Sequence, residues 1–461
     1  MKLCRFLFHH LFLLSSAFSI LDFPLNSQVS IPVPSGAVEG GFHGRAFILG
    51  AAGKDRHRPG FRLALSVEAI ALGEYRCSLV VLLGDVEVWS SDHLLRFLVR
   101  RGCTLKLAGD GDLQLSDMAV RRVGWRTGTS FQGVQRLQLE SRTGNLILAD
   151  TMNRTRWQSF DYPTNIMLWR QQLRPPANLT SFPAVSPSVS YSMEIQRSKL
   201  VAYLIWGSYK YSYWEFNPSF GRRITIARLG SKGLKLLDNR LKKIGQIEAM
   251  NLETVRFMKL GISGSLEMYY YSATEVGFKL SYRVPSEFCN LPLSCPPCEI
   301  CSSSDNTCKK LSWMTCNQNG FCQDLNSRME MLEMVGIDAV LRTESPAQAT
   351  NISRKGCLNS CLEDCSCAAV MYYEGDGDGR NSECCKYGMV IGAREGGRGN
   401  GSSYWVKIQR ERGSNQALKE KFLILGGIVD GVAICLILGG LVYYVIWRIR
   451  NTRNNFANCN N

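Results

Sequence analysis

The sequence predicts a mainly β protein built from several extracellular modules and one membrane-spanning helix. Three observations predict this class: alternating apolar positions separated by Gly-Asn and Gly-Asp turns, 18 cysteines that gather largely in two clusters, and two apolar segments near the ends of the chain. The 461 residues are 45% hydrophobic and 20% charged, which excludes wholesale disorder. The net charge of +15 indicates acidic partners or surfaces.

Residues 1–19 are expected to be a secretory signal peptide. A basic start precedes an apolar run from Phe6 to Ile20, which is shorter than the roughly 20 residues that a membrane span needs. A buried helix is the alternative. Secretion makes disulfides the default state of the cysteines and argues against nucleic acid as a partner.

An internal repeat follows, marked by three tryptophans. Trp89, Trp125 and Trp157 are spaced by 36 and 32 residues, and similar strand and turn patterns precede Trp125 and Trp157. Three such units, each bringing one tryptophan inward, could close a small β-prism. The alternative is three unrelated tryptophans in a β-rich domain.

A family resemblance supports the prism. Plant S-locus glycoproteins and the related G-type lectin receptor kinases end their bulb-type lectin domain with a segment that closely resembles residues 157–164, Trp-Gln-Ser-Phe-Asp-Tyr-Pro-Thr. The resemblance implies a bulb-type lectin-like β-prism over residues 30–168 and an S-locus-glycoprotein-like β region over residues 169–285.

The sugar-binding positions of such lectins are only partly retained. Each mannose site of the family carries Gln, Asp, Asn, Val and Tyr at alternate positions. The corresponding candidates here are Asp110, Asp112, Asn145 and Ile147; Asp110 and Asn145 fit the pattern, and Ile147 is a conservative replacement. Because most hydrogen-bonding groups are lost, we expect weak or absent mannose binding and a fold retained as a protein-interaction scaffold.

A cysteine-rich segment occupies residues 286–325 and is similar to the EGF-like segment of the same family. A zinc or iron–sulfur site is the alternative, but no histidine lies nearby and secretion favours disulfides. We therefore expect no metal and no cofactor. The connectivity stays open. The candidate disulfide cysteines are Cys289, Cys295, Cys298, Cys301, Cys308, Cys316 and Cys322.

The next module, residues 335–410, closely resembles the PAN/apple domain of these proteins. Its spacing of four predicts that Cys357, Cys361 and Cys365 share one face of a helix that packs on a sheet. Three further candidate disulfide cysteines are Cys367, Cys384 and Cys385. Once the signal-peptide, membrane and tail cysteines are set aside, 15 remain, so at least one must be free or bonded to another chain.

Residues 422–447 predict a transmembrane helix, followed by a cytoplasmic tail at 448–461. Together with the signal peptide, this predicts a type I single-pass protein of the plasma membrane with an extracellular ectodomain. Gly427, Asp430 and Gly431 have the spacing of a helix-pairing site, although an acid tolerated near the helix end is the alternative. The predicted N-glycosylation sites, all in the ectodomain, are Asn153, Asn178, Asn351 and Asn400.

No catalytic residues are predicted, because the sequence contains no kinase, hydrolase or nucleotide-binding motif. The function predicted is that of a non-catalytic cell-surface recognition protein. It would bind a secreted protein or a glycan outside the cell and signal through a partner receptor kinase, as a co-receptor or decoy. The alternative is a lectin that binds acidic cell-wall polysaccharide and is merely anchored by its membrane helix; a purely structural anchor protein is a third interpretation.

Overall fold

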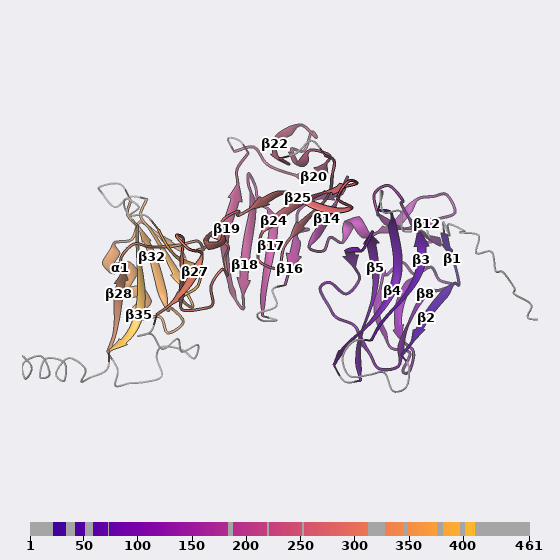
Figure 1. The fold of residues 1–461 in the computed structure, drawn as a ribbon, viewed down its shortest axis with the longest axis horizontal. Coiled ribbons are helices and arrows are strands. Elements are labelled where there is room, and N and C mark those ends of the chain that lie inside the picture. Colours follow the sequence, from indigo (N-terminus) through magenta and orange to yellow (C-terminus); the bar gives the residue numbers. More distant parts are fainter. Residues whose placement is uncertain are drawn as a thin grey trace, which may run out of the picture.

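Three β-rich modules follow one another along an elongated molecule (Figure 1). The computed structural model describes residues 22–33, 42–50, 59–71, 73–182, 188–218, 221–250, 253–311, 328–343, 348–375, 381–396 and 402–410. The predicted signal peptide, the membrane helix with Gly427, Asp430 and Gly431, and the tail lie outside these residues. Within the described part of the chain, no helix is long and apolar enough to cross a bilayer.

The first module is a prism of three antiparallel sheets. One sheet has the order β3-β4-β5-β6, with β7 paired to β5; the second is β2-β8-β9-β10 and the third is β1-β11-β12-β13. The strands are β1 (Asp22–Pro24), β2 (Gln28–Pro32), β3 (His43–Gly50), β4 (Phe61–Ala71), β5 (Glu74–Leu83), β6 (Val86–Ser90), β7 (Leu98–Val99), β8 (Gly102–Leu107), β9 (Leu113–Asp117), β10 (Val123–Arg126), β11 (Val134–Leu139), β12 (Leu146–Asp150) and β13 (Thr155–Gln158).

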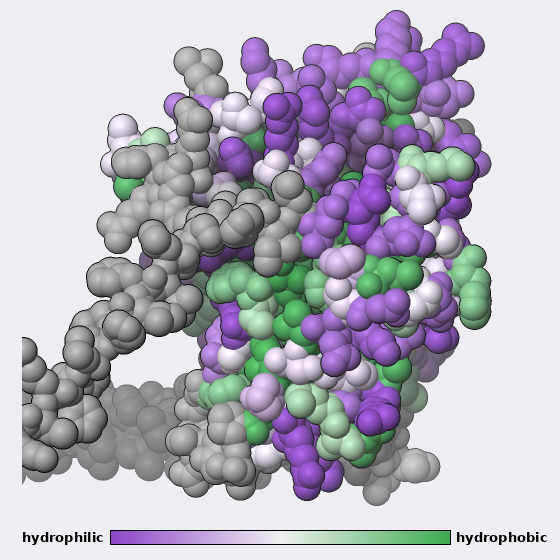
Figure 2. All heavy atoms as spheres, turned by 90° about the vertical axis from the view of Figure 1, so that its right-hand side faces the viewer, coloured by the Kyte–Doolittle hydropathy of each residue, from purple (hydrophilic) through white to green (hydrophobic). Residues whose placement is uncertain are grey.

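Each sheet of this first prism sends its apolar face to a shared core. Along β9, for example, Leu113 and Leu115 are buried while Gln114 and Ser116 are partly exposed, as period-two alternation requires. The outward faces are mostly hydrophilic in the end view of the molecule, with apolar groups gathered in a few patches (Figure 2). A disulfide between Cys77 and Cys103 joins two sheets.

The first prism does not keep its predicted limits of 30–168. β1 pairs with β11 and β2 pairs with β8, so the module begins before residue 30. At its other end, β14 (Ile166–Leu168) pairs with β23 (Val255–Leu260) and belongs to the next module. The prediction was wrong at these ends because it rested on the Trp repeat and on the family segment at residues 157–164, and neither carries information about the strands that complete each sheet.

The second module repeats the topology of the first. Here too, the first strand in the chain pairs with the last three strands, the second with the middle three and the third with the first three, giving β14-β23-β24-β25, β15-β20-β21-β22 and β16-β17-β18-β19. The region predicted only as β-rich is therefore a second three-sheet prism. Its remaining strands are β15 (Gln172–Leu173), β16 (Leu179–Ser181), β17 (Val189–Ile195), β18 (Leu200–Trp206), β19 (Tyr209–Phe216), β20 (Ile226–Gly230), β21 (Gly233–Leu237), β22 (Lys243–Glu248), β24 (Leu266–Ser272) and β25 (Gly277–Val284).

The third module consists of a small cysteine-rich hairpin and a five-stranded sheet, β28-β35-β32-β33-β31, that carries helix α1 (Arg354–Leu362). The sheet begins at Arg328, earlier than the predicted limit of 335. Strand β34 pairs with the hairpin strand β26 and with β29. The strands are β26 (Glu299–Ser302), β27 (Thr307–Lys310), β28 (Arg328–Met334), β29 (Ile337–Ala339), β30 (Arg342–Thr343), β31 (Gln348–Thr350), β32 (Ala369–Tyr373), β33 (Glu383–Tyr387), β34 (Ala393–Glu395) and β35 (Ser402–Arg410).

The second and third modules share one continuous hydrophobic core. Strand β30 extends the sheet of the second prism by pairing with β19. Across the same seam, the rings of Tyr211 and Tyr387 stack with centroids 5.8 Å apart, and the Tyr387 hydroxyl donates a 2.7 Å hydrogen bond to the carbonyl of Leu341. This shared core holds the two modules as one body.

Helix α1 is fixed by caps at both ends. The Ser353 hydroxyl accepts a 3.1 Å hydrogen bond from the Gly356 amide at its start. At its end the buried Lys407 ammonium donates 3.0 Å to the carbonyl of Cys361 and 3.1 Å to that of Asp364. The helix ends at Leu362, so Cys365 lies beyond it, and the prediction that three cysteines share one helical face holds only for Cys357 and Cys361.

Candidate functional site

Asp112, a predicted sugar-binding residue, uses its side chain for hydrogen bonds within the prism. Its side chain is fully buried, and one carboxylate oxygen accepts hydrogen bonds from the Thr127 hydroxyl (2.9 Å) and the Gly128 amide (2.8 Å). The Thr129 amide donates to the same oxygen at 3.1 Å. Asp112 therefore connects the β8–β9 turn to the loop after β10, and no acceptor capacity faces solvent.

The same holds for Asn145 in the third sheet. Its amide donates 2.8 Å to the Gln158 side chain, its carbonyl oxygen accepts from the Phe160 amide at 3.2 Å, and the residue is buried. Asp110 is partly exposed but accepts the Asp112 amide at 3.1 Å, and Ile147 is partly exposed on β12. Of the four predicted positions only Ile147 lies in a strand: Asp110 and Asp112 lie in the β8–β9 turn, and Asn145 directly precedes β12. Asp112 and Asn145 have structural roles.

The three tryptophans meet at one end of the first prism. Trp89, Trp125 and Trp157 come from the last strand of each sheet, and their rings form a triangle of edge-to-face contacts with centroids 6.2, 6.0 and 6.1 Å apart. This confirms that each repeat brings one tryptophan inward. The indole of Trp89 donates 2.9 Å to the carbonyl of Tyr162, which fixes the turn that follows β13 and the 3-10 helix η1 (Ser159–Asp161).

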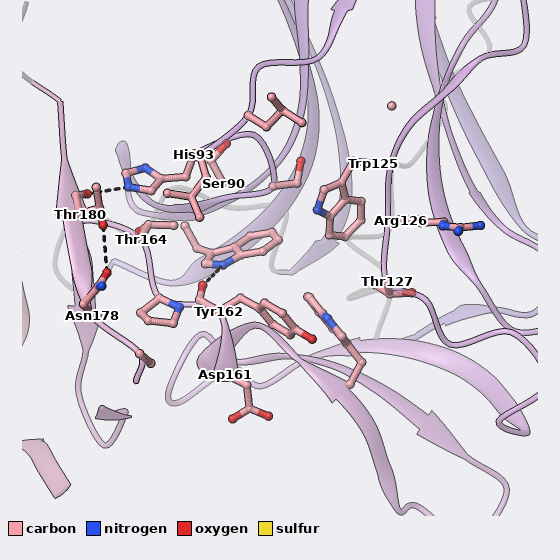
Figure 3. Close-up of a pocket in the computed structure, with 18 of the residues that line it drawn as sticks. Ser90, His93, Trp125, Arg126, Thr127, Asp161, Tyr162, Thr164, Asn178 and Thr180 are labelled. Carbon is pink, nitrogen blue, oxygen red and sulfur yellow. Dashed lines mark hydrogen bonds between the residues drawn. The ribbon is translucent and has the colours of Figure 1, made fainter. Parts of the chain in front are cut away.

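Beside this triangle lies a cavity of about 460 Å³, here called the tryptophan pocket. Trp125 and Tyr162 face it, and Tyr162 stacks on Trp157 with centroids 5.5 Å apart while 56% of its own surface stays exposed (Figure 3). Residues 176–180, in the second prism, close the opposite side. The pocket is therefore a cleft with an aromatic floor at the junction of two modules, a common setting for ligand sites.

Polar groups surround that floor. On one side, His93 contacts the Thr180 carbonyl through Nε2 at 2.6 Å, and the Thr180 hydroxyl donates 3.0 Å to the Asn178 side chain (Figure 3). Asp161 lies at the opposite rim and accepts from the Gln158 amide at 3.0 Å. Burial is the largest effect on His93 and lowers its pKa, so the ring is neutral at pH 7 and serves as a hydrogen-bonding spacer between the two prisms.

The pocket offers no catalytic arrangement of the kind that nucleophilic or acid–base chemistry needs. It contains one exposed carboxylate and one neutral imidazole, which lie on opposite sides of the cavity in Figure 3. Among the described residues, no group of three or more His, Cys, Asp or Glu side chains is placed to hold a metal ion. The arrangement is suited to binding.

Five disulfides have both partners in the described residues. In the third module Cys289 is bonded to Cys301, Cys295 to Cys308, Cys357 to Cys384 and Cys361 to Cys367. Cys298 and Cys365 are also disulfide-bonded, whereas Cys316 and Cys322 lie outside the described residues. The remaining pair, Cys77 with Cys103, was not among the candidates, because neither belongs to a cysteine cluster.

Cys385 corrects the predicted disulfide set, because it is a buried free thiol. Consecutive residues of a strand point to opposite faces, so on β33 Cys384 faces helix α1 while Cys385 faces the core shared with the second prism. Three of the predicted glycosylation sites, Asn153, Asn178 and Asn351, lie in described loops or strand ends; Asn400 does not. Asn178 is at the rim of the tryptophan pocket.

Comparison with known proteins agrees with this architecture. Residues 88–180 match the D-mannose binding lectin family. The predicted resemblance to the S-locus-like lectin family is confirmed. A G-type lectin S-receptor-like serine/threonine-protein kinase, SD2-5 of Arabidopsis thaliana, is 21% identical over 306 residues, covering 62% of this chain and 36% of the relative.

Two further relatives come from the same plant. A PAN domain-containing protein is 24% identical and covers 59% of this chain and 58% of the relative; a second G-type lectin S-receptor-like kinase is 24% identical and covers 80% and 49%. The chain thus spans less than two thirds of the length of each. A monomeric mannose-binding lectin structure from Gastrodia elata is 26% identical over 19% of this chain and 80% of that chain, with a TM-score of 0.15.

Proposed function

We propose that this chain is a non-catalytic recognition protein whose first prism binds an oligosaccharide in the tryptophan pocket. One observation carries the proposal: the pocket's lining residues run from Trp89 to Thr180 and all lie within the segment, 88–180, that matches the D-mannose binding lectin family. The match supports carbohydrate as the ligand class, and the pocket supplies a concave surface that can hold it.

The chemistry of the pocket suits a sugar. The exposed ring of Tyr162 and the half-buried ring of Trp125 offer faces on which the apolar C–H side of a pyranose can pack. Asp161 and Arg126, which also line the pocket, supply an acceptor and donors for hydroxyl groups. By contrast, the side chains at the predicted positions Asp112 and Asn145 already form hydrogen bonds inside the prism and are not free for a sugar.

Replacing Tyr162 by Ala is expected to weaken oligosaccharide binding at least about tenfold, since losing a stacked ring together with the apolar area it buries costs about 1.4 kcal/mol or more. Binding of the full-length protein to a panel of immobilised neutral oligosaccharides, mannosides included, measures this. All forms carry Asn178→Gln, because a glycan on that residue would sit at the same rim.

Phe131→Ala is the matched control for this experiment. Phe131 is an aromatic residue of the same prism, 88% exposed and outside the pocket. Its replacement should leave binding unchanged. Equal losses in the two variants, or no binding of any panel member by the Asn178→Gln protein, would remove the proposal.

We further propose that the chain signals through a second membrane protein. The chain would sit in the plasma membrane, expose both prisms and the PAN/apple module outside, and act through a partner receptor kinase as a co-receptor or decoy. Its similarity to G-type lectin S-receptor-like kinases over a part of their length supports this. Affinity capture from intact membranes after gentle crosslinking should enrich a receptor kinase with the full-length protein. Capture that enriches no membrane protein would contradict it.

A further inference from the structure

The second prism carries most of the molecule's net positive charge. Residues 169–285 contain 17 Lys or Arg and 7 Asp or Glu, which makes +10 of the chain's net +15. These residues form a separate sheet system from the tryptophan pocket of the first prism. In the sheet β15-β20-β21-β22, strand pairing places several of these cations next to one another.

Side chains on the outer face of that sheet form a continuous row across four strands. Gln172 pairs with Arg228, Arg228 with Lys235, and Lys235 with Gln246. Their neighbours Ala227, Leu229, Leu234 and Leu236 face the core, so these four side chains point outward. Two more cations extend the row. Arg174 donates a 3.0 Å hydrogen bond to the side-chain oxygen Oε1 of Gln172, and Lys243 donates one of 3.4 Å to Oε1 of Gln246.

The row presents hydrogen-bond donors. Arg and Lys have no acceptors, and the carbonyl ends of Gln172 and Gln246 are already occupied by Arg174 and Lys243. One amide hydrogen of Gln246 reaches the Lys232 carbonyl at 3.5 Å. A ligand that complements such a row must be rich in acceptors, as carboxylates and their neighbouring hydroxyl groups are.

The two central cations form no ion pair with an acid among the described residues. Arg228 and Lys235 stand directly opposite each other, where like charges on neighbouring strands destabilise a sheet. The buried Nε of Arg228 has no hydrogen-bond partner among the described residues. The acid on this face, Glu248, lies two residues beyond Gln246 at the end of β22. An anion bound between the two cations would relieve their repulsion.

Two glycines lie beside the row on the same face of the sheet. Gly230 pairs with Gly233 across β20 and β21, two residues along from Arg228 and Lys235, and the Lys235 side chain lies over Gly230, where a Cβ would be 3.5 Å from its Cε. Gly233 also has φ +119°, and a Cβ there would lie 2.1 Å from the Ile247 carbonyl oxygen, so no other residue fits.

We propose that this row, Arg174, Gln172, Arg228, Lys235, Gln246 and Lys243, binds an extended polyuronate, an acidic polysaccharide. Arg228 and Lys235 pair with carboxylates of nearby uronic acid units, and the amides of Gln172 and Gln246 donate to sugar hydroxyls. A polymer with charges repeated along its length matches a straight row of donors better than a single compact anion does. The site is independent of the tryptophan pocket, so either can fail without the other.

The test uses the full-length protein and two probes with one backbone: de-esterified polygalacturonate and its fully methyl-esterified, neutral form. Arg228→Gln/Lys235→Gln should weaken binding to the charged probe at least about tenfold, since each charge-assisted contact contributes about 1.5 kcal/mol or more. Arg222→Gln/Arg223→Gln removes the same charge from exposed residues of the same module outside the sheet and should change binding less than about threefold. Wild type should bind the esterified probe at least about tenfold more weakly.

Three results would overturn the proposal. Equal losses in the two double variants would show that binding depends on net charge alone and not on this row. Equal binding of the esterified and the charged polymer would show that carboxylates are not recognised. Stronger binding to phosphatidylserine vesicles that depends on the same row would identify a membrane surface as the partner instead. Thermal unfolding checks folding: relief of the Arg228–Lys235 repulsion should leave the melting temperature unchanged or raised. If the double variant does not fold, Lys235→Gln alone gives the same comparison.

Discussion

Trp157→Ala should lower the free energy of unfolding by about 3–5 kcal/mol, the range for removing a large aromatic side chain from a core. Trp157 is buried, contacts both other tryptophans of the triangle and stacks on Tyr162. Its loss leaves a cavity where three sheets meet, and no single sheet can move to fill it. Urea-induced unfolding followed by circular dichroism measures the change.

Trp169→Ala is the control for this prediction. Trp169 is partly exposed, lies between β14 and β15 of the second prism and makes a cation–π contact with Arg170 at 4.6 Å. Its replacement should cost about 1 kcal/mol or less. A three-sheet prism closed around a tryptophan triangle would be contradicted if the two variants lost equal stability.

Removing the disulfide between Cys357 and Cys384 should cost about 2–5 kcal/mol in the stability of the third module. This bond joins helix α1 to strand β33 across 27 residues of sequence, and its two sulfurs lie in a small core of their own. The double variant Cys357→Ser/Cys384→Ser avoids a stray thiol. Denaturant unfolding of the full-length protein, compared with wild type, gives the cost.

Cys385→Ala is the control, because Cys385 is a free thiol whereas its neighbour Cys384 is disulfide-bonded. Burial is the main reason that the pKa of Cys385 is raised, so its thiol is unreactive in the folded protein. In denaturant without reductant, the thiol count should fall by one in Cys385→Ala and stay unchanged in the double serine variant. A count that rises in Cys385→Ala would show that Cys385 had a disulfide partner.

Much of the first prism could be predicted from the sequence, because its signal is local. The 36 and 32 residue spacing of three tryptophans follows from three similar units, and the structure places these rings in mutual contact. The second prism repeats the same strand order without a tryptophan repeat, because aliphatic residues such as Leu229 and Leu236 fill its core. A topology retained without its marker residues leaves no local pattern to recognise.

The candidate site was less predictable, and for two physical reasons. Alternate spacing places Asp112 and Asn145 on strand-like positions, but whether a side chain there faces solvent depends on the neighbouring loop, here Thr127 and Gly128. The tryptophan pocket combines residues 89–164 of one prism with 176–180 of the next, which no local motif joins. For Cys385 a signal did exist, since adjacent cysteines on one strand cannot face the same partner.

The most direct test of the account is an isothermal titration of the best-binding oligosaccharide into the Asn178→Gln protein and two variants, Tyr162→Ala in the pocket and Ile147→Ala at a strand position. Both side chains are accessible on the same prism. A pocket site predicts an affinity loss of about tenfold or more for Tyr162→Ala and less than about twofold for Ile147→Ala. The reverse pattern would place the sugar on the strand positions of the mannose-binding lectins and contradict the pocket.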